Sequence, residues 1–401
     1  MYRCLELAKL AAGYVAPNPM VGAVLLYNGQ IIGEGYHQEY GGPHAEPNCL
    51  ESVKEENIQF ISSSTLYVSL EPCVHYGKTP PCTDLIIRHK IPKVIIGCRD
   101  PFKEVNGKGI EKLRTAGTEV EPGVLEKECK ELNKRFFCFH TQHRPYIILK
   151  WAETADGKMA APSNSPNGGE SHTQTRIGEE NIYYSNSRIN GVSGADSSPM
   201  EGSRMGARLF ISNEYSNRLV HKWRSEEAAI LIGTNTALMD DPQLTTRLWN
   251  GRSPMRLVVD MDLKLPSSLK IFNGEAPTIV FNKIKHDLNK EAPTPHLPIA
   301  IGMERAGVRF YQVTEDVNLV HQIINALYLL KIQSLIVEGG ARLLQSFIDE
   351  DLWDEARIVR SSELRVQNGL PAPQLSNALK SEEQIILSDI VEVFKPLRDR
   401  L

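Results

Sequence analysis

Four side chains in two short segments constrain this chain more than any other feature. His44 and Glu46 stand two residues apart, and Cys73 and Cys82 flank a loop rich in glycine and proline. Imidazole and thiolate are preferred ligands of Zn²⁺, and a catalytic zinc takes three protein ligands and keeps its fourth position for water. The fold must therefore bring His44, Cys73 and Cys82 around one point, with the Glu46 carboxylate beside it.

The carboxylate of Glu46 distinguishes a catalytic zinc site from a structural one. A structural site usually closes with a fourth cysteine or histidine, whereas this pattern offers a carboxylate. A catalytic zinc lowers the pKa of water from about 15.7 to about 7, and a nearby glutamate can carry the proton to a departing amine. The pattern predicts a zinc deaminase with Glu46 as acid and base. A structural zinc site or a set of buried cysteines is the alternative.

The residues around the ligands predict strand ends and helix starts. The run from Thr65 to Leu70 is β-branched and aromatic, as in a buried strand, so Cys73 follows its carboxyl end, where open α/β sheets carry their sites. A proline precedes both His44 and Cys82, which favours a helix beginning at each ligand. The positive dipole ends of two helices would help to hold the cysteines as thiolates.

Length and charge limit the remaining possibilities. A chain of 401 residues allows two domains, and a net charge of −4 gives no electrostatic footprint for nucleic acid. Seven cysteines, an odd number, match no disulfide framework and indicate a reducing compartment. We find no basic segment followed by an apolar core at the start, and no apolar run near the ~18 residues of a membrane span. We therefore expect a cytoplasmic protein.

Alternating strand and helix patterns predict two α/β domains, residues 1–143 and 144–401. In the first, a helical pattern from Tyr2 to Ala12 precedes a hairpin that turns at Asn28-Gly29, the dipeptide that a type I′ turn requires. Strands and helices then alternate, as in a layered α/β domain. An amphipathic helix from Val124 to Phe137 is expected to close this domain.

A linker over residues 141–145 is expected to lead into the second domain. Its first strand is predicted from Tyr146 to Trp151, and residues 162–208, rich in Ser, Gly and Asn, indicate a flexible insertion or a lid that orders on ligand binding. Further apolar runs predict strands at residues 228–232, 256–259, 278–281 and 335–337.

The second domain has no ordinary dinucleotide fingerprint. Gly-x-Gly-x-x-Gly follows none of its predicted strands, which excludes a common Rossmann site. A Gly339-Gly340 pair instead separates a strand from a helical pattern, and backbone N–H groups of Gly340, Ala341 and Arg342 at that helix start could bind a pyrophosphate. Alone, a glycine pair is weak evidence, and Arg224 by its pattern belongs to a solvated helix face.

Three polar residues of the first domain could recognise a substrate. The loop between the cysteines is longer than the Cys-x2-Cys of nucleic-acid deaminases and places His75 and Lys78 near the metal, where the lysine could meet a phosphate. Asn18 lies between two prolines. It is either a turn residue or an amide that recognises a ring, and the residues leave both open.

With these motifs, the chain resembles the bifunctional deaminase-reductases of riboflavin biosynthesis over nearly its whole length. The resemblance implies a cytidine-deaminase-like three-layer α/β/α domain followed by a dihydrofolate-reductase-like α/β domain. The matching segments are Pro17 to Gly22, His44-Ala45-Glu46, the loop from Glu71 to Asp84, Asp156-Gly157-Lys158, Gly233 to Pro242, and Val337 to Gly340.

The resemblance implies two reactions and their site residues. One Zn²⁺ per chain would serve deamination of 2,5-diamino-6-(5-phosphoribosylamino)pyrimidin-4(3H)-one, and NADPH would reduce the ribosyl group of the deaminated product to ribityl. Positions that would contact substrate are Asn18, His75, Lys78, Arg224, Leu244, Arg247 and Glu338. Positions that would contact NADPH are Ala152, Phe210, Thr236, Asp240, Gly340, Ala341, Arg342, Leu343, Leu344, Gln345 and Ser346. Family members associate, so we expect a homo-oligomer, a dimer or a tetramer.

One departure from the family leaves an alternative open. The family usually has a short Ser-Gly-x-Ser-x-Trp-Ile segment after Asp-Gly-Lys, whereas here the long insertion follows, and the usual serine has no clear counterpart. Phe210 would replace the tryptophan beside the cofactor. A zinc deaminase with a degenerate reductase domain is therefore the alternative. A nucleic-acid deaminase lacks basic patches with interleaved aromatics, and a zinc-stapled binding module would have no use for Glu46.

Overall fold

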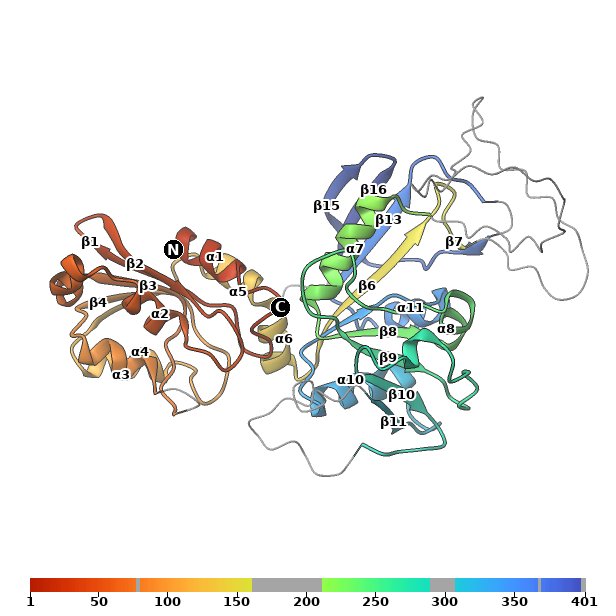
Figure 1. The fold of residues 1–401 in the computed structure, drawn as a ribbon, viewed down its shortest axis with the longest axis horizontal. Coiled ribbons are helices and arrows are strands. Elements are labelled where there is room, and N and C mark those ends of the chain that lie inside the picture. The colour runs from red at the N-terminus through yellow and green to blue at the C-terminus, as the bar shows by residue number, and fades with distance from the viewer. Residues whose placement is uncertain (77–79, 161–210, 289–306, 367–368, 398–401) are drawn as a thin grey trace, which may run out of the picture.

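The computed structural model has two large β-sheets, each with helices on both faces, and a small sheet of the two strands β14 (Leu370–Pro371) and β7 (Lys158–Ala160) (Figure 1). The structure describes residues 1–76, 80–160, 211–288, 307–366 and 369–397. The predicted insertion at 162–208, Lys78 and Phe210 lie outside these described residues. Within them, no helix combines the length and the apolar character that a membrane crossing requires.

The first sheet has five strands and lies in the middle of a three-layer sandwich. Its region contains α1 (Tyr2–Lys9), β1 (Gly22–Tyr27), β2 (Gln30–Tyr36), α2 (Ala45–Glu51), the 3-10 helix η1 (Glu55–Ser63), β3 (Thr65–Leu70), α3 (Cys82–Arg88), β4 (Lys93–Cys98), α4 (Lys108–Thr115), β5 (Glu119–Pro122), α5 (Glu126–Leu132) and α6 (Lys134–Gln142). The strand order is β2-β1-β3-β4-β5, and β3, β4 and β5 are parallel. Helices α2, α3 and α4 cover one face, and α1 and α5 cover the other.

Local sequence signals place the elements around the zinc ligands as predicted. The hairpin between β1 and β2 turns at Asn28 and Gly29, whose φ angles of 46° and 79° are both positive, as a type I′ turn requires. Strand β3 has the predicted bounds, and α2 and α3 begin next to the two prolines. The strand ends and helix starts that carry the ligands are confirmed.

The expected single helix from Val124 to Phe137 is wrong, because it breaks at Asn133. The Asn133 amide accepts a hydrogen bond from the backbone N–H of Met20 at 2.8 Å and donates one to the Met20 carbonyl at 2.9 Å. This long-range clasp holds Asn133 at φ −105° and ψ 25°, outside the helical region. Two helices, α5 and α6, result.

The expected linker at 141–145 is shorter than predicted. Helix α6 runs on to Gln142 and ends where His143 takes a φ of 55°. The buried side chain of Cys138 belongs to a core cluster of the second sheet, and the Phe139 ring lies 4.9 Å from that of Tyr328. Helix α6 therefore packs against the second sheet, as Figure 1 also shows.

The second sheet has nine strands and begins with the expected strand at Tyr146. Its region contains β6 (Tyr146–Glu153), β7 (Lys158–Ala160), α7 (Glu214–Glu226), β8 (Ala229–Gly233), α8 (Thr234–Asp240), β9 (Met255–Val259), the 3-10 helix η2 (Lys270–Phe272), β10 (Thr278–Asn282), β11 (Val308–Gln312), α10 (Leu319–Leu329), β12 (Ser334–Val337), α11 (Ala341–Asp349), β13 (Glu355–Ser361), β14 (Leu370–Pro371), β15 (Ala378–Ile386) and β16 (Asp389–Pro396). The strand order is β11-β10-β9-β8-β12-β6-β13-β16-β15.

Most of this sheet is parallel and buried on both faces. The first seven strands in this order, from β11 across the sheet to β13, run parallel to one another. In this sheet, only β16 and β15 are antiparallel to their neighbours. Helices α10 and α11 cover one face, and α7 and α8 cover the other. The carboxyl ends of β6, β8 and β12 therefore meet at one edge, where parallel sheets carry their sites.

Candidate active sites

The three expected metal ligands converge in the first domain. The His44 Nδ1 atom lies 3.6 Å from Cys73 Sγ and 3.3 Å from Cys82 Sγ, and the three ligand atoms lie within 4.8 Å of one another. Typical Zn–N and Zn–S bonds at a tetrahedral angle would separate nitrogen from sulfur by about 3.6 Å. Two thiolates and one imidazole at these distances fit a zinc ion.

Hydrogen bonds from the start of α3 hold Cys73 in place. The Cys73 sulfur lies 3.3 Å from the backbone N–H of Cys82, and the Cys73 carbonyl accepts hydrogen bonds from the N–H and the hydroxyl of Thr83 at 3.2 and 3.1 Å. Hydrogen bonds from Cys82 and His44 lower the pKa of Cys73 below that of an ordinary thiol, which favours the thiolate that a metal binds.

Glu46 lies in the first turn of α2, two residues beyond the His44 cap. Its side chain is buried, and burial raises its pKa above the ordinary value of a glutamate. Its carboxyl group also hydrogen-bonds with the Cys82 thiol. A carboxyl group whose pKa is raised toward neutrality is suited to both accepting and releasing a proton.

The carboxylate of Glu71, which the sequence analysis did not single out, fixes the strand end before Cys73. It is buried and accepts four backbone N–H groups from the loop before α4 and from the start of that helix, at 2.9 to 3.3 Å. A Cβ at Gly109 would lie 2.3 Å from the Pro72 carbonyl oxygen, so only glycine allows this approach. An acidic residue directly before Pro-Cys was the available signal.

The orientation of Asn18 is set by His37. The His37 Nδ1 atom lies 2.8 Å from the Pro43 carbonyl, which can only accept, so Nδ1 carries the proton. In the neutral imidazole, Nε2 then accepts from the Asn18 amide nitrogen, 3.1 Å away. The His37 ring meets that of His44 edge to face at 5.4 Å, which places Asn18 beside the metal ligands.

The other two expected substrate residues lie on the loop between the cysteines. The His75 ring lies 6.0 Å from that of Phe102, and its buried Nδ1 has no hydrogen-bond partner among the described residues. Lys78 falls in the segment that the structure leaves undescribed. Of these two residues, the structure therefore describes only His75, whose Nδ1, unpartnered within the described part of the chain, leaves it able to bind a polar group.

In the second domain, a buried ion network joins three elements. Glu338, directly after β12, accepts two parallel hydrogen bonds from Arg224 of α7, at 2.8 and 2.6 Å. Lys150 of β6 lies 3.9 Å from the same carboxylate. The expected solvated helix face at Arg224 is thus wrong, since this side chain is only 13% exposed and is paired with Glu338. Burial lowers the pKa of Lys150, which the sequence analysis missed inside an apolar strand.

Arg247 is brought to the same region by the loop between α8 and β9. Its backbone N–H donates to His221 Nδ1 at 2.9 Å, and its guanidinium donates to Gln243 at 2.7 Å. Burial and the Arg224 guanidinium both lower the pKa of Arg247. Leu244 in this loop is buried and has a φ of 59°. The structure thus gathers Arg224, Arg247, Leu244 and Glu338 around one place.

The glycine pair before α11 forms a close approach between two helix starts. A Cβ at Gly339 would lie 2.8 Å from the Ile232 side chain, and Gly340 has a φ of 67°. A Cβ at Gly340 would lie 3.4 Å from the Thr236 hydroxyl of α8. The backbone N–H groups at the start of α11 therefore face α8 without intervening side chains, which fits a pyrophosphate.

Several other residues expected to contact the cofactor are buried or hydrogen-bonded within the protein itself. Leu344 is fully buried in the core, and the Ser346 hydroxyl donates to the Leu343 carbonyl at 2.7 Å. The Gln345 amide donates to Asp349 at 2.8 Å. Ala152 lies on β6 opposite Val359 of β13 and is half-buried. Asp240 is the last residue of α8.

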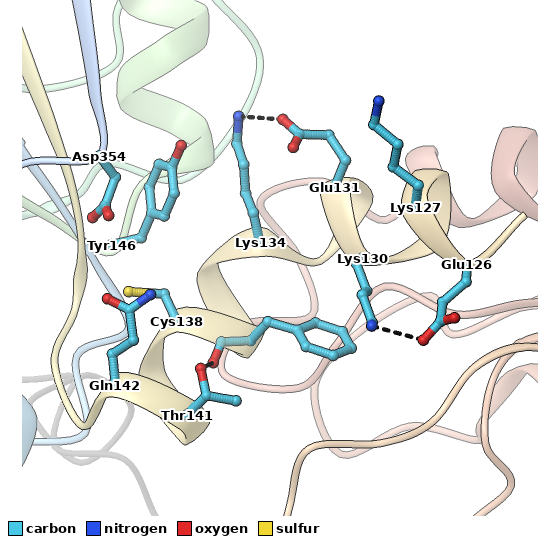
Figure 2. A pocket seen from close by; sticks show the side chains of 11 residues that line it. Glu126, Lys127, Lys130, Glu131, Lys134, Cys138, Thr141, Gln142, Tyr146 and Asp354 are labelled. Carbon is cyan, nitrogen blue, oxygen red and sulfur yellow. Dashed lines mark hydrogen bonds and ion pairs between the residues drawn. The ribbon is translucent and has the colours of Figure 1, made fainter. Parts of the chain in front are cut away.

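A cavity of about 660 Å³ lies at the junction of the two domains and is not lined by any of these site residues (Figure 2). Two of its three lysines are paired, Lys130 with Glu126 at 2.7 Å and Lys134 with Glu131 at 3.2 Å. Its lining is Glu126, Lys127, Lys130, Glu131, Lys134, Phe137, Cys138, Thr141, Gln142, Tyr146 and Asp354. Because lysines and carboxylates both line this cavity, it has no strong preference for a cation or an anion.

Comparison with known proteins covers both regions of the chain. Residues 145–362 match the family model of the RibD C-terminal domain, and residues 1–98 match that of the cytidine and deoxycytidylate deaminase zinc-binding region. The riboflavin biosynthesis protein RibD of Aquifex aeolicus is 38% identical over 356 residues, which cover 88% of this chain and 83% of that protein.

Solved structures extend the match to nearly the whole chain. The diaminohydroxyphosphoribosylaminopyrimidine deaminase/5-amino-6-(5-phosphoribosylamino)uracil reductase of Thermotoga maritima superposes with a TM-score of 0.75 at 32% identity. The match covers 99% of this chain and 97% of that one. RibD of Acinetobacter baumannii superposes with a TM-score of 0.76 at 26% identity, covering 99% and 98%.

Proposed function

The chain belongs to the RibD family of riboflavin biosynthesis proteins, and from this we propose a role for each residue of its two sites. As a member it is a bifunctional enzyme, a zinc-dependent deaminase joined to an NADPH-dependent reductase. The expected fold class, a cytidine-deaminase-like domain followed by a dihydrofolate-reductase-like domain, is confirmed. A degenerate reductase is not favoured. We divide the domains at residues 143 and 144.

For deamination, we assign the metal to His44, Cys73 and Cys82 and the proton transfers to Glu46. Bound zinc would supply a hydroxide nucleophile at neutral pH. Glu46 takes the proton from water and delivers it to the departing amine, because its buried carboxyl group has a raised pKa and lies beside the ligands. This placement of Glu46 is the observation that carries the assignment.

The pyrimidine substrate is bound by Asn18, His75 and Lys78. His37 holds the nitrogen end of the Asn18 amide, so the carbonyl end is left for a ring N–H. His75 has an unsatisfied buried nitrogen among the described residues, which a polar substrate group would satisfy. Lys78 is assigned to the phosphate from its sequence position alone.

For reduction, the substrate is bound by Arg224, Leu244, Arg247 and Glu338. Glu338 occupies Nε and Nη2 of Arg224, which leaves its Nη1 group to bind phosphate together with the Arg247 guanidinium. NADPH, which supplies the hydride, would be held by backbone N–H groups of the Gly340 to Arg342 turn. We assign the rest of its site to Ala152, Phe210, Thr236, Asp240, Leu343, Leu344, Gln345 and Ser346.

A two-step assay tests this function. The full-length protein is given the diamino substrate, and ammonia release is followed; NADPH oxidation is then followed with the deaminated product, and repeated with NADH. We expect both steps, with NADPH preferred. A folded, zinc-loaded protein that releases ammonia but oxidises neither nucleotide would contradict the reductase assignment.

We also propose a cytoplasmic homo-oligomer, a dimer or a tetramer. The support is that none of the seven cysteines forms a disulfide, which suits a reducing compartment, together with the family membership. Light scattering on the purified chain would give its mass in solution, and a monomer at micromolar concentration would contradict the proposal.

A further inference from the structure

The loop that carries Arg247 has a strained backbone. Asp241 and Leu244 have φ angles of 38° and 59°, in the left-handed region that residues with a Cβ avoid. Non-glycine residues persist there only where surrounding contacts hold them, and such residues concentrate at functional sites. The contacts that hold this loop are therefore candidates for a role in the reaction.

One of these contacts comes from His221 of α7. Its Nδ1 accepts a hydrogen bond from the backbone N–H of Arg247 at 2.9 Å. An imidazole nitrogen accepts only when it carries no proton, so His221 is neutral, with its proton on Nε2. Burial, and after it the positive charges of Arg224 and Arg247, together lower the pKa of His221 to about 4. The imidazole is thus a permanent acceptor at neutral pH.

The same helix also holds the second arginine of the site. Arg224 lies three residues after His221, on the same face of α7, and its guanidinium is fixed by Glu338. The Arg224 charge depresses the pKa of Arg247, so the two guanidinium groups repel each other across the site. Two cations held together against repulsion suit a dianionic ligand such as a phosphate ester.

We propose that His221 is a positioning residue of the reductase site, which fixes the backbone of Arg247 so that its guanidinium and that of Arg224 meet the substrate phosphate together. The inference rests on the proposed phosphate-binding role of Arg247. A side chain without an acceptor at the Nδ1 position releases the loop, and Arg247 then moves away from Arg224. Phosphate affinity falls, while the hydride donor and its site are unaffected.

Two amide variants separate this role from simple packing. In His221→Asn, the amide oxygen can take the place of Nδ1 and still accept from Arg247. In His221→Gln, the longer side chain carries its amide toward the Nε2 position and loses that bond. For the full-length protein with 5-amino-6-(5-phosphoribosylamino)uracil, we expect H221Q to raise KM about tenfold, the loss of one hydrogen bond. We expect H221N to stay within about threefold of the wild type.

Three further readouts accompany the kinetics. The KM for NADPH and the rate of deamination should not change in either variant: the first shows that the reductase domain is folded, and the second shows that the deaminase domain is folded and loaded with zinc. Inorganic phosphate, used as a competitive inhibitor of reduction, should bind about tenfold more weakly to H221Q and normally to H221N. If H221Q does not fold, His221→Ala replaces it in the comparison.

Equal KM values in H221N and H221Q, both raised or both unchanged, would overturn the positioning role. The variant Arg247→Ala separates this failure from failure of the proposed function. If R247A leaves the KM for the phosphorylated substrate unchanged, the phosphate assignment is wrong. If R247A raises it while H221N and H221Q agree, only the role of His221 is wrong.

Discussion

The two active sites of this protein are built in different ways. In the zinc site, three ligands and Glu46 come from neighbouring strand ends and helix starts, and each stands next to a proline that marks its element. In the reductase site, Lys150, Arg224 and Glu338 come from three elements far apart in the chain and meet only across the finished sheet. A metal site is therefore visible in sequence, whereas a charge network is visible only in the fold.

The largest test of this comparison is Glu46→Gln. A glutamine cannot take a proton, so deamination should fall by about 10² to 10⁴-fold, the usual contribution of a general acid and base. Ammonia release measures the loss, and zinc content is measured on the same sample. Reduction of the deaminated product serves as the control and should be unchanged. Wild-type deamination with zinc still bound would contradict the role of Glu46.

A smaller effect is expected from Glu338→Ala. This variant leaves Arg224 and Lys150 buried without their counter-charge, at a cost of about 3–5 kcal/mol. Reduction should fall more than tenfold and the second domain should unfold at lower urea, while ammonia release persists. The control is Glu315→Ala, which removes an exposed partner of Lys283. Equal losses in the two variants would show that the network has no special place in the reductase.

Acid should weaken the same network. Burial opposes ionisation of Glu338, but Arg224 and Lys150 outweigh it and lower its pKa to about 2, below the ordinary 4.5. Because the folded pKa is the lower one, the stabilisation is present above pH 4.5 and is lost as pH falls toward 2. It amounts to up to about 3 kcal/mol. Urea unfolding at pH 6, 4 and 3 measures it, and E338Q should show a flatter dependence. A slope identical in E338Q and wild type would assign the acid sensitivity to other groups.

The smallest effect is expected at the junction cavity. Lys130→Ala removes one exposed ion pair with Glu126, so the free energy of unfolding should change by less than about 0.5 kcal/mol. Both reactions should keep their rates and KM values, since this cavity contains no residue of either site. A change in either KM would mean that the cavity takes part in substrate binding, and the division into two separate sites would need revision.

The predictable part of the fold was the part with local causes. Asn28-Gly29 fixed one hairpin, and the run from Thr65 to Leu70 fixed one strand, because turn chemistry and β-branching act over a few residues. The ligands of the metal were predictable for the same reason. Glu71 was not, because its four backbone partners lie 29 to 39 residues away along the chain.

Other misses share that cause. Asn133 breaks a helix through its two hydrogen bonds to the Met20 backbone, and no residue near it in sequence indicates this break. Strand β15 escaped prediction because it lies at the edge of the sheet and exposes most of its side chains, so it lacks an apolar period. Lys150 lies in an apolar run, and its partner Glu338 is found only across the parallel sheet.

The packing of helix α6 limits where this chain can be divided into two separate polypeptides. Phe139 packs on Tyr328, Lys134 pairs with Glu355 at 2.7 Å, and Cys138 enters the second core. A deaminase fragment ending at residue 143 would carry this face into water and would be prone to aggregate, although its zinc site would be intact. If the gene were split just before Asn133, helix α6 would stay on the same polypeptide as the second domain, which covers its apolar face. The Asn133 clasp on Met20 would then become a contact between two separate polypeptides.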